Sequence, residues 1–66
     1  MKVIEENYCI ASKTFPLKFY DHNGNETAFI EPCVLFFDKE ECEKELKIYD
    51  EPNEYQIIKV KVTYEF

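Results

Sequence analysis

The chain of 66 residues is 45% hydrophobic, contains eleven Phe and Tyr residues, and carries a formal net charge of −6. This length predicts a single domain over residues 1–66, close to the lower size limit for folding without disulfides or a metal. All eight basic residues are Lys, and this acidic balance argues against direct nucleic-acid binding and against binding to an anionic membrane surface, which both depend on positive charge.

The N-terminal half predicts strands joined by a hairpin. Residues 2–11 are apolar enough for a first strand, with a turn or bulge in the Glu-Glu-Asn segment. Apolar residues at positions 15, 17 and 19 alternate with Pro, Lys and Tyr at positions 16, 18 and 20, which is typical of a second strand. The Asn-Gly pair at 23–24 indicates a two-residue hairpin turn, and this register places Phe19 opposite Ala28.

A continuous apolar run over residues 33–37 has the length of a strand and predicts either a strand buried on both sides or a short link into the core, after a break introduced by a proline. Residues 38–49 then have the pattern of a capped surface helix. Asp38 is placed to cap its N-terminus, Glu41 to complete a capping box, and Phe37 to form a hydrophobic staple with the first turn. Two glutamates each precede a lysine by four residues, the favourable orientation for ion pairs along a helix.

The last segment, residues 55–66, is the clearest strand in the chain. From residue 58 onward its even-numbered residues are apolar and share one face, while lysines, Thr and Glu occupy the other. We expect this strand to be central in the sheet or to pair with the N-terminal strand, because an exposed apolar edge invites aggregation. The predicted fold class is therefore α+β: a four- or five-stranded, mostly antiparallel sheet with one helix packed on one face, in the order β-β-β-β-α-β.

Neither a metal site nor a catalytic centre is predicted. Cys9, Cys33 and Cys42 lack CxxC spacing and sit among apolar neighbours, and His22 lies in the expected turn. An odd number of cysteines does not indicate a disulfide framework. The sequence has no nucleophile elbow, and its one glycine is used by the hairpin, so we expect neither a cofactor nor enzymatic activity.

An acidic interaction surface is the first candidate functional site. Residues 38–54 hold eight carboxylates and three lysines, a net charge of −5 within seventeen residues. This clustering would steer the protein onto a basic partner surface, although a solvated helix face is the ordinary outcome of a charged run. The eight acidic residues are Asp38, Glu40, Glu41, Glu43, Glu45, Asp50, Glu51 and Glu54.

The second candidate is the face of the sheet that one short helix leaves uncovered. It combines aromatic and aliphatic side chains with lysines, and contiguous apolar patches of this kind mark interfaces. A homodimer through this face is the simplest assembly, since twofold oligomers are the commonest, and scattered exposed aromatics are the alternative. The expected interface residues are Lys18, Tyr20, Phe29, Ile57, Lys59 and Lys61.

Two segments, FDKEECEKEL with the strand before it and EYQIIKVKVTYE, resemble small proteins encoded by phages and mobile elements of low-GC bacteria. The richness in Lys, Glu, Ile, Tyr and Asn without Arg fits the same source. The resemblance implies function by binding, either by blocking a host enzyme or defence complex or by sequestering a small signalling ligand. It identifies no specific family and transfers no functional residue.

We therefore expect a non-enzymatic cytoplasmic protein that inhibits or modulates a host or defence protein with a basic surface, in the manner of phage counter-defence. The alternative from a different class is an oligomeric protein that sequesters a nucleotide-type small molecule in pockets between subunits. A third alternative is a structural accessory of a larger assembly. No segment has the apolar core of a signal peptide or the length of a membrane span, so we expect no membrane association.

Overall fold

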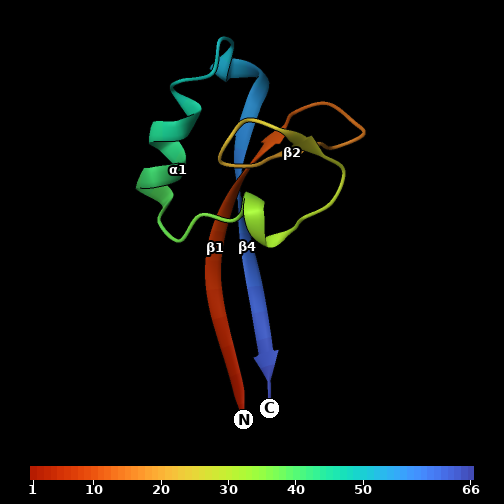
Figure 1. Cartoon of the computed structure of the whole chain (residues 1–66), viewed down its shortest axis with the longest axis vertical. Coiled ribbons are helices and arrows are strands. Elements are labelled where there is room, and N and C mark those ends of the chain that lie inside the picture. The colour runs from red at the N-terminus through yellow and green to blue at the C-terminus, as the bar shows by residue number, and fades with distance from the viewer.

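A computed structural model describes residues 1–66 of the chain (Figure 1). The strands form one antiparallel sheet in the order β3-β2-β1-β4, and the single α-helix packs on it, which confirms the α+β class. None of the helices has the length and apolar character needed to cross a membrane. The elements are β1 (Lys2–Ser12), β2 (Phe19–Tyr20), β3 (Glu26–Thr27), a 3-10 turn (Pro32–Val34), α1 (Lys39–Leu46), a second 3-10 turn (Pro52–Glu54) and β4 (Tyr55–Glu65).

β1 and β4 form the spine of the molecule. All eleven residues of β1 pair with β4, from Lys2 opposite Glu65 to Ser12 opposite Tyr55. The turn or bulge expected in the Glu-Glu-Asn segment is wrong, because β4 supplies an unbroken partner for each of these residues. β4 pairs with the N-terminal strand as predicted, but it lies at the edge of the sheet and not at its centre.

The hairpin between β2 and β3 forms, but its register differs from the prediction by one residue. Phe19 pairs with Thr27 and not with Ala28, because the loop has three residues instead of two. The Asp21 carboxylate accepts hydrogen bonds of 2.8 Å from two backbone N–H groups of the turn, and Gly24 closes the loop with a φ of +83°. A local side-chain contact therefore selects a longer turn than the Asn-Gly pair alone indicates.

Residues 33–37 do not form the predicted strand. Pro32 starts a 3-10 turn that ends at Val34, and Phe36 meets the sheet through a single bridge to Tyr8 with N···O distances of 2.9 and 2.7 Å. Val34 is completely buried against one face of the sheet, and Phe36 is buried against the other. The apolar run thus forms a short link into the core, the alternative to a strand, and packs on β1 from both faces.

The helix is shorter and less capped than predicted. α1 ends at Leu46, because the two N–H groups of the following turn bond three residues back and tighten it. Asp38 is the N-cap residue, but its side chain makes no capping hydrogen bond. Phe37 is 80% exposed and forms no staple, and neither expected Glu–Lys ion pair forms. Burial of Cys42 and Leu46 in an apolar cluster is what holds the helix on the sheet.

Two small apolar clusters lie on opposite faces of the sheet. The odd-numbered residues of β1 contribute to the first cluster, and its even-numbered residues contribute to the second, which α1 covers. The buried members of the first cluster are Cys9, Ala11, Phe19 and Val34, and those of the second are Ile10, Phe36 and Cys42.

Toward the chain ends the β1–β4 pair leaves the rest of the molecule (Figure 1). We call residues 1–6 and 61–66 the ribbon, and residues 7–60 the body. The ribbon lengthens the molecule to dimensions of 42 × 25 × 17 Å and carries exposed apolar side chains on both faces. It is a two-stranded segment without a core of its own.

Candidate functional site

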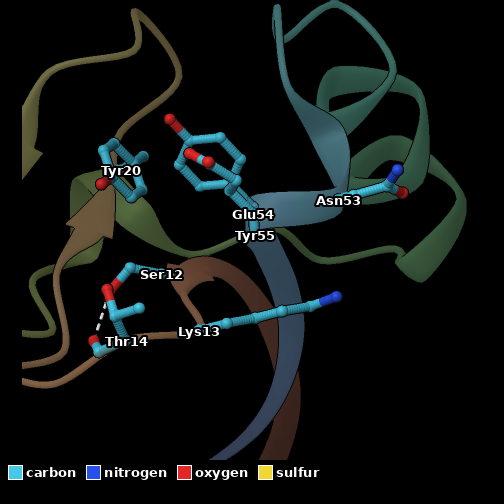
Figure 2. Close-up of a pocket in the computed structure, with 7 residues that line it drawn as sticks. All are labelled: Ser12, Lys13, Thr14, Tyr20, Asn53, Glu54 and Tyr55. Carbon is cyan, nitrogen blue, oxygen red and sulfur yellow. Dashed lines mark hydrogen bonds between the residues drawn. The ribbon is translucent and has the colours of Figure 1, made fainter.

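A cavity of about 300 Å³ opens where the end of β1 meets the turn before β4. Lys13 and Glu54 meet there, because the N–H of Lys13 donates to the Glu54 carbonyl oxygen at 3.1 Å and continues the β1–β4 ladder. Figure 2 shows the rings of Tyr20 and Tyr55 near one another, with the Lys13 ammonium group pointing away from them. The lining residues are Ser12, Lys13, Thr14, Tyr20, Asn53, Glu54 and Tyr55.

Ser12 fixes the loop that leaves β1 beside this cavity. Its hydroxyl donates to the Thr14 carbonyl oxygen at 3.1 Å (Figure 2) and accepts from the Lys18 N–H at 3.0 Å. Its own carbonyl oxygen accepts from the Gln56 side-chain amide at 3.0 Å. Ser12 therefore has a structural role in positioning the cavity residues that follow it.

Three tyrosines join the sheet to the segment after α1. The Tyr55 ring lies 5.1 Å from that of Tyr20 and 4.8 Å from that of Tyr49, with near-perpendicular planes. Edge-to-face pairs of this kind are worth about 0.5–1.5 kcal/mol each beyond their burial. The Tyr49 hydroxyl is buried without a hydrogen-bond partner, and burial, followed by the negative charge of Glu45, raises the pKa of Tyr49 to about 12.

The acidic segment, residues 38–54, comprises α1 and the turn that leads to β4. Seven of its eight carboxylates are exposed, and Glu45 is half-buried. The fold places this segment at the end of the molecule opposite the tip of the ribbon (Figure 1). The predicted acidic residues are therefore on the surface of one region of the body.

No lysine neutralises the acidic segment through a direct ion pair. The ion pair that the chain forms joins Lys59 to Glu6, which are 3.2 Å apart and both about half exposed. Within the segment, a hydrogen bond to Glu51 and the negative charge of that residue raise the pKa of the Glu54 carboxyl. The helix and its following turn thus present a net negative charge to solvent, with no carboxylate held in an ion pair.

The expectation that α1 leaves the side of Tyr20 and Ile57 uncovered is wrong. Both side chains pack in the apolar cluster beneath the helix, together with Tyr55. The reason is that Ile10 on the even-numbered face of β1 provides the surface on which Cys42 of α1 packs. The uncovered apolar surface of the sheet lies on the ribbon instead.

The other residues expected at the sheet interface are dispersed. Lys59 and Lys61 are exposed on the same face of β4 as Ile57. Lys18 is half-buried before β2, and Phe29 lies in the loop after β3 with 71% of its surface exposed. Because β2 and β3 pair over only two residues each, the hairpin does not carry these side chains onto one face.

The cysteines have the environments of packing residues. Cys9 and Cys42 are completely buried, and Cys33 is exposed. Burial raises the pKa of the Cys9 thiol, and it raises that of Cys42 to about 12, with a further contribution from Cys9. The two buried thiols are therefore held in their neutral, unreactive form.

His22 connects the hairpin loop to the segment after the first 3-10 turn. Its Nε2 lies 3.0 Å from the Leu35 carbonyl oxygen, and its ring centroid is 4.2 Å from that of Phe36. No group of three or more His, Cys, Asp or Glu side chains is placed to hold a metal ion. The one histidine thus makes a packing contact in the body.

Comparison with known proteins assigns no family. No protein-family model matches the chain, and no curated protein or solved structure shows significant similarity to it.

Among the predicted site residues only Tyr20 and Glu54 line the cavity, so sequence reasoning missed five of its residues: Ser12, Lys13, Thr14, Asn53 and Tyr55. They meet because two strands far apart in the sequence pair along their whole length. The sequence does hold one signal for this cavity. When residues 2–12 are aligned antiparallel with residues 55–65, the register that pairs apolar with apolar residues brings the end of the first strand to the start of the last.

Proposed function

We propose that this protein is a small non-enzymatic binding protein that inhibits or modulates a host macromolecule by docking its acidic segment on a basic surface. The observation that carries the proposal is that eight carboxylates share one region of the body and none forms an ion pair within the chain. Unpaired surface charge of one sign accelerates association with a surface of the opposite sign. The resemblance to phage and mobile-element proteins adds that the partner is a host or defence protein.

The acidic segment is also anchored to the body by packing contacts, which supports docking. Cys42 and Leu46 fix α1 on the sheet, and the edge-to-face contact of Tyr49 with Tyr55 fixes the turn behind it. A charged surface that is ordered before binding loses less conformational entropy when the complex forms.

The test begins with capture and identification of a partner from host lysate, followed by titration calorimetry with the purified partner at low and high salt. Reversal of two exposed charges, Glu40→Lys with Glu43→Lys, is expected to weaken binding by about tenfold or more at low salt. Added salt should weaken binding of the unaltered protein in the same direction.

The matched control reverses two exposed charges outside the segment, Glu5→Lys with Glu31→Lys, and gives the same net charge. It should leave the dissociation constant nearly unchanged. If both pairs of reversals weaken binding equally, the effect is due to net charge and not to the acidic segment. If neither the reversals nor added salt changes the dissociation constant, docking through the acidic segment is refuted.

A second candidate function is small-molecule sequestration, and the cavity is the observation that favours it. Its volume of about 300 Å³ lies at the lower end of the range for ligand sites, and its lining includes Tyr20, Tyr55 and Lys13, although the Lys13 ammonium group points away from the two rings. Rings suit a planar base, and a lysine supplies a point charge for phosphate.

Thermal unfolding in the presence of a nucleotide panel tests this second function. A nucleotide that binds in the cavity should raise the unfolding midpoint of the unaltered chain and not that of Lys13→Ala. Lys47→Ala removes the same charge from the surface outside the cavity and should keep the full shift. If no nucleotide moves the midpoint, sequestration of this ligand class is ruled out.

A further inference from the structure

The outer edge of β4 has free hydrogen-bonding groups. The N–H of Phe66 donates to the Met1 carbonyl oxygen, and that of Lys13 donates to Glu54, which sets the phase of the β1–β4 ladder. In this phase the even-numbered residues of β4 bond to β1, and the odd-numbered residues direct their N–H and C=O groups outward. No strand of the chain lies on that side, because β4 ends the sheet. The outward-bonding residues beyond Ile57 are Lys59, Lys61, Thr63 and Glu65.

The ribbon lacks the support that a two-stranded segment requires. An isolated pair of strands is marginally stable in water, and a long apolar edge is a template for another strand. On one face of the ribbon, Val3 is 37% exposed beside Tyr64, its pairing partner, at 46%, and Phe66 is 78% exposed. Lysines on an edge strand ordinarily keep other strands away. The positions of Lys59 and Lys61 therefore decide which strand can pair with the β4 edge without placing like charges opposite each other.

A second copy of β4 fits this edge in antiparallel register centred on Val62. Outward-bonding residues must face each other, so odd-numbered residues have to oppose odd-numbered residues. On one face every pair is then apolar: Val62 with its own copy, Val60 with Tyr64, and Ile58 with Phe66. On the other face no like charges meet: Lys59 lies opposite Glu65, and Lys61 opposite Thr63.

The neighbouring registers are poorer. Centring the pair on Lys61 places the two copies of this lysine opposite each other, and centring it on Val60 places Lys59 opposite Lys61 twice. Centring it on Thr63 avoids like charges but loses the contact of Ile58. The register about Val62 gives the longest overlap without a like-charge pair.

We propose that two copies of this chain associate edge to edge through β4, in antiparallel register about Val62, and form one continuous sheet. The strand order becomes β3-β2-β1-β4-β4-β1-β2-β3, and the twofold axis runs perpendicular to the sheet. Both α1 helices then lie on the same face, and the two acidic segments lie at opposite ends of the assembly. This interface is independent of the proposed acidic docking, so either can fail without the other.

Sedimentation equilibrium over a range of protein concentrations tests the interface. The unaltered chain should have the mass of a dimer, and Thr63→Pro should weaken dimerisation by at least about tenfold. Proline at this position removes an outward N–H that the monomer does not use, so the β1–β4 ladder is kept. Thr63→Ala retains the N–H and should remain dimeric, and circular dichroism checks that both variants are folded.

A cysteine scan tests the register. In a Cys33→Ser background, Val62→Cys places the two introduced thiols at a pair with Cα atoms about 4.5 Å apart, within reach of a disulfide. Val60→Cys is the matched control, because its two copies lie about 14 Å apart. Mild oxidation with diamide should crosslink only the Val62→Cys chain.

Three results would overturn the proposal. A monomer at every concentration would show that the edge stays free. A dimer that survives Thr63→Pro would place the contact elsewhere, such as the shorter outer edge of β1 over residues 2–6. Equal crosslinking of Val62→Cys and Val60→Cys would show that the register about Val62 does not form.

Discussion

The body and the ribbon are built from the same two strands but have different surroundings. Ile10 and Ile4 lie on the same face of β1, yet Ile10 is completely buried beneath α1 and Ile4 is 57% exposed. On the opposite face, Cys9 is completely buried and Val3 is 37% exposed. Side chains alternate between the two faces of β1 in both regions. The segments that pack on the sheet, α1 and residues 34–36, determine which half of the strand is buried.

This contrast separates the roles of the two regions. The body contains both apolar clusters, the tyrosine contacts, the cavity and the acidic segment, so it carries the stability and the proposed docking surface. The ribbon contains backbone groups and apolar side chains that the chain itself leaves without partners. A small protein can thus keep a free strand edge that its own core does not depend on.

The largest expected difference between the body and the ribbon is in stability, and it is tested by comparing Ile10→Ala with Ile4→Ala. Truncation of the buried side chain should lower the free energy of unfolding by about 2–5 kcal/mol, much of the roughly 3–10 kcal/mol expected for this length. Truncation in the ribbon should change it by less than about 0.5 kcal/mol. Urea denaturation measures both values. Similar losses at the two positions would mean that Ile4 is covered in solution and would break the comparison.

Alkaline titration should destabilise the body. The pKa of Cys42 rises from its ordinary value of 9.0 to about 12, and that of Tyr49 from 10.0 to about 12, chiefly because of burial. Since each pKa is higher in the folded state, the contribution to stability is complete below pH 9 and is lost as the pH rises from 9 toward 12. Urea denaturation at several pH values should show this decline. A flat profile above pH 9 would contradict the burial of both groups.

Removal of the Tyr49 hydroxyl sharpens the same point. The Tyr49→Phe variant should be as stable as the unaltered chain or more stable by about 1 kcal/mol, because the buried hydroxyl has no hydrogen-bond partner. It should also lose part of the decline in stability above pH 10. The matched control is Tyr64→Phe in the ribbon, where the side chain is 46% exposed and no comparable gain is expected. A clear loss of stability in Tyr49→Phe would reveal a partner for this hydroxyl.

The smallest expected effect lies at the border between the two regions. Glu6→Gln breaks the ion pair with Lys59, whose two side chains are each about half exposed. The free energy of unfolding should fall by less than about 1 kcal/mol, and added salt should reduce the difference. Thermal unfolding at low and high salt measures it. A larger, salt-independent loss would indicate that the supported part of the spine extends farther toward the chain ends.

Local patterns along the chain were sufficient for the fold class. Strict alternation from Ile58 onward predicted the C-terminal strand, and the 38–49 pattern predicted the helix to within its last turn. Seven of the eight acidic residues are exposed and Glu45 is half-buried, because charge is excluded from an apolar core wherever no partner compensates it. These features depend on residues close together in the sequence, which is why reading along the chain recovers them.

The tertiary structure alone decided the face that α1 covers and the cavity. Packing of Cys42 on Ile10 placed α1 over Tyr20, and full-length pairing of β1 with β4 brought Lys13 to Glu54. The hairpin register depends on a local contact, the Asp21 carboxylate with two N–H groups of its own turn, which the Asn-Gly pair alone does not indicate. Composition and alternation determined that this chain forms a small acidic α+β domain. Contacts between distant segments determined which half of its spine is a core and which is an open edge, because burial depends on what crosses a strand and not on the strand itself.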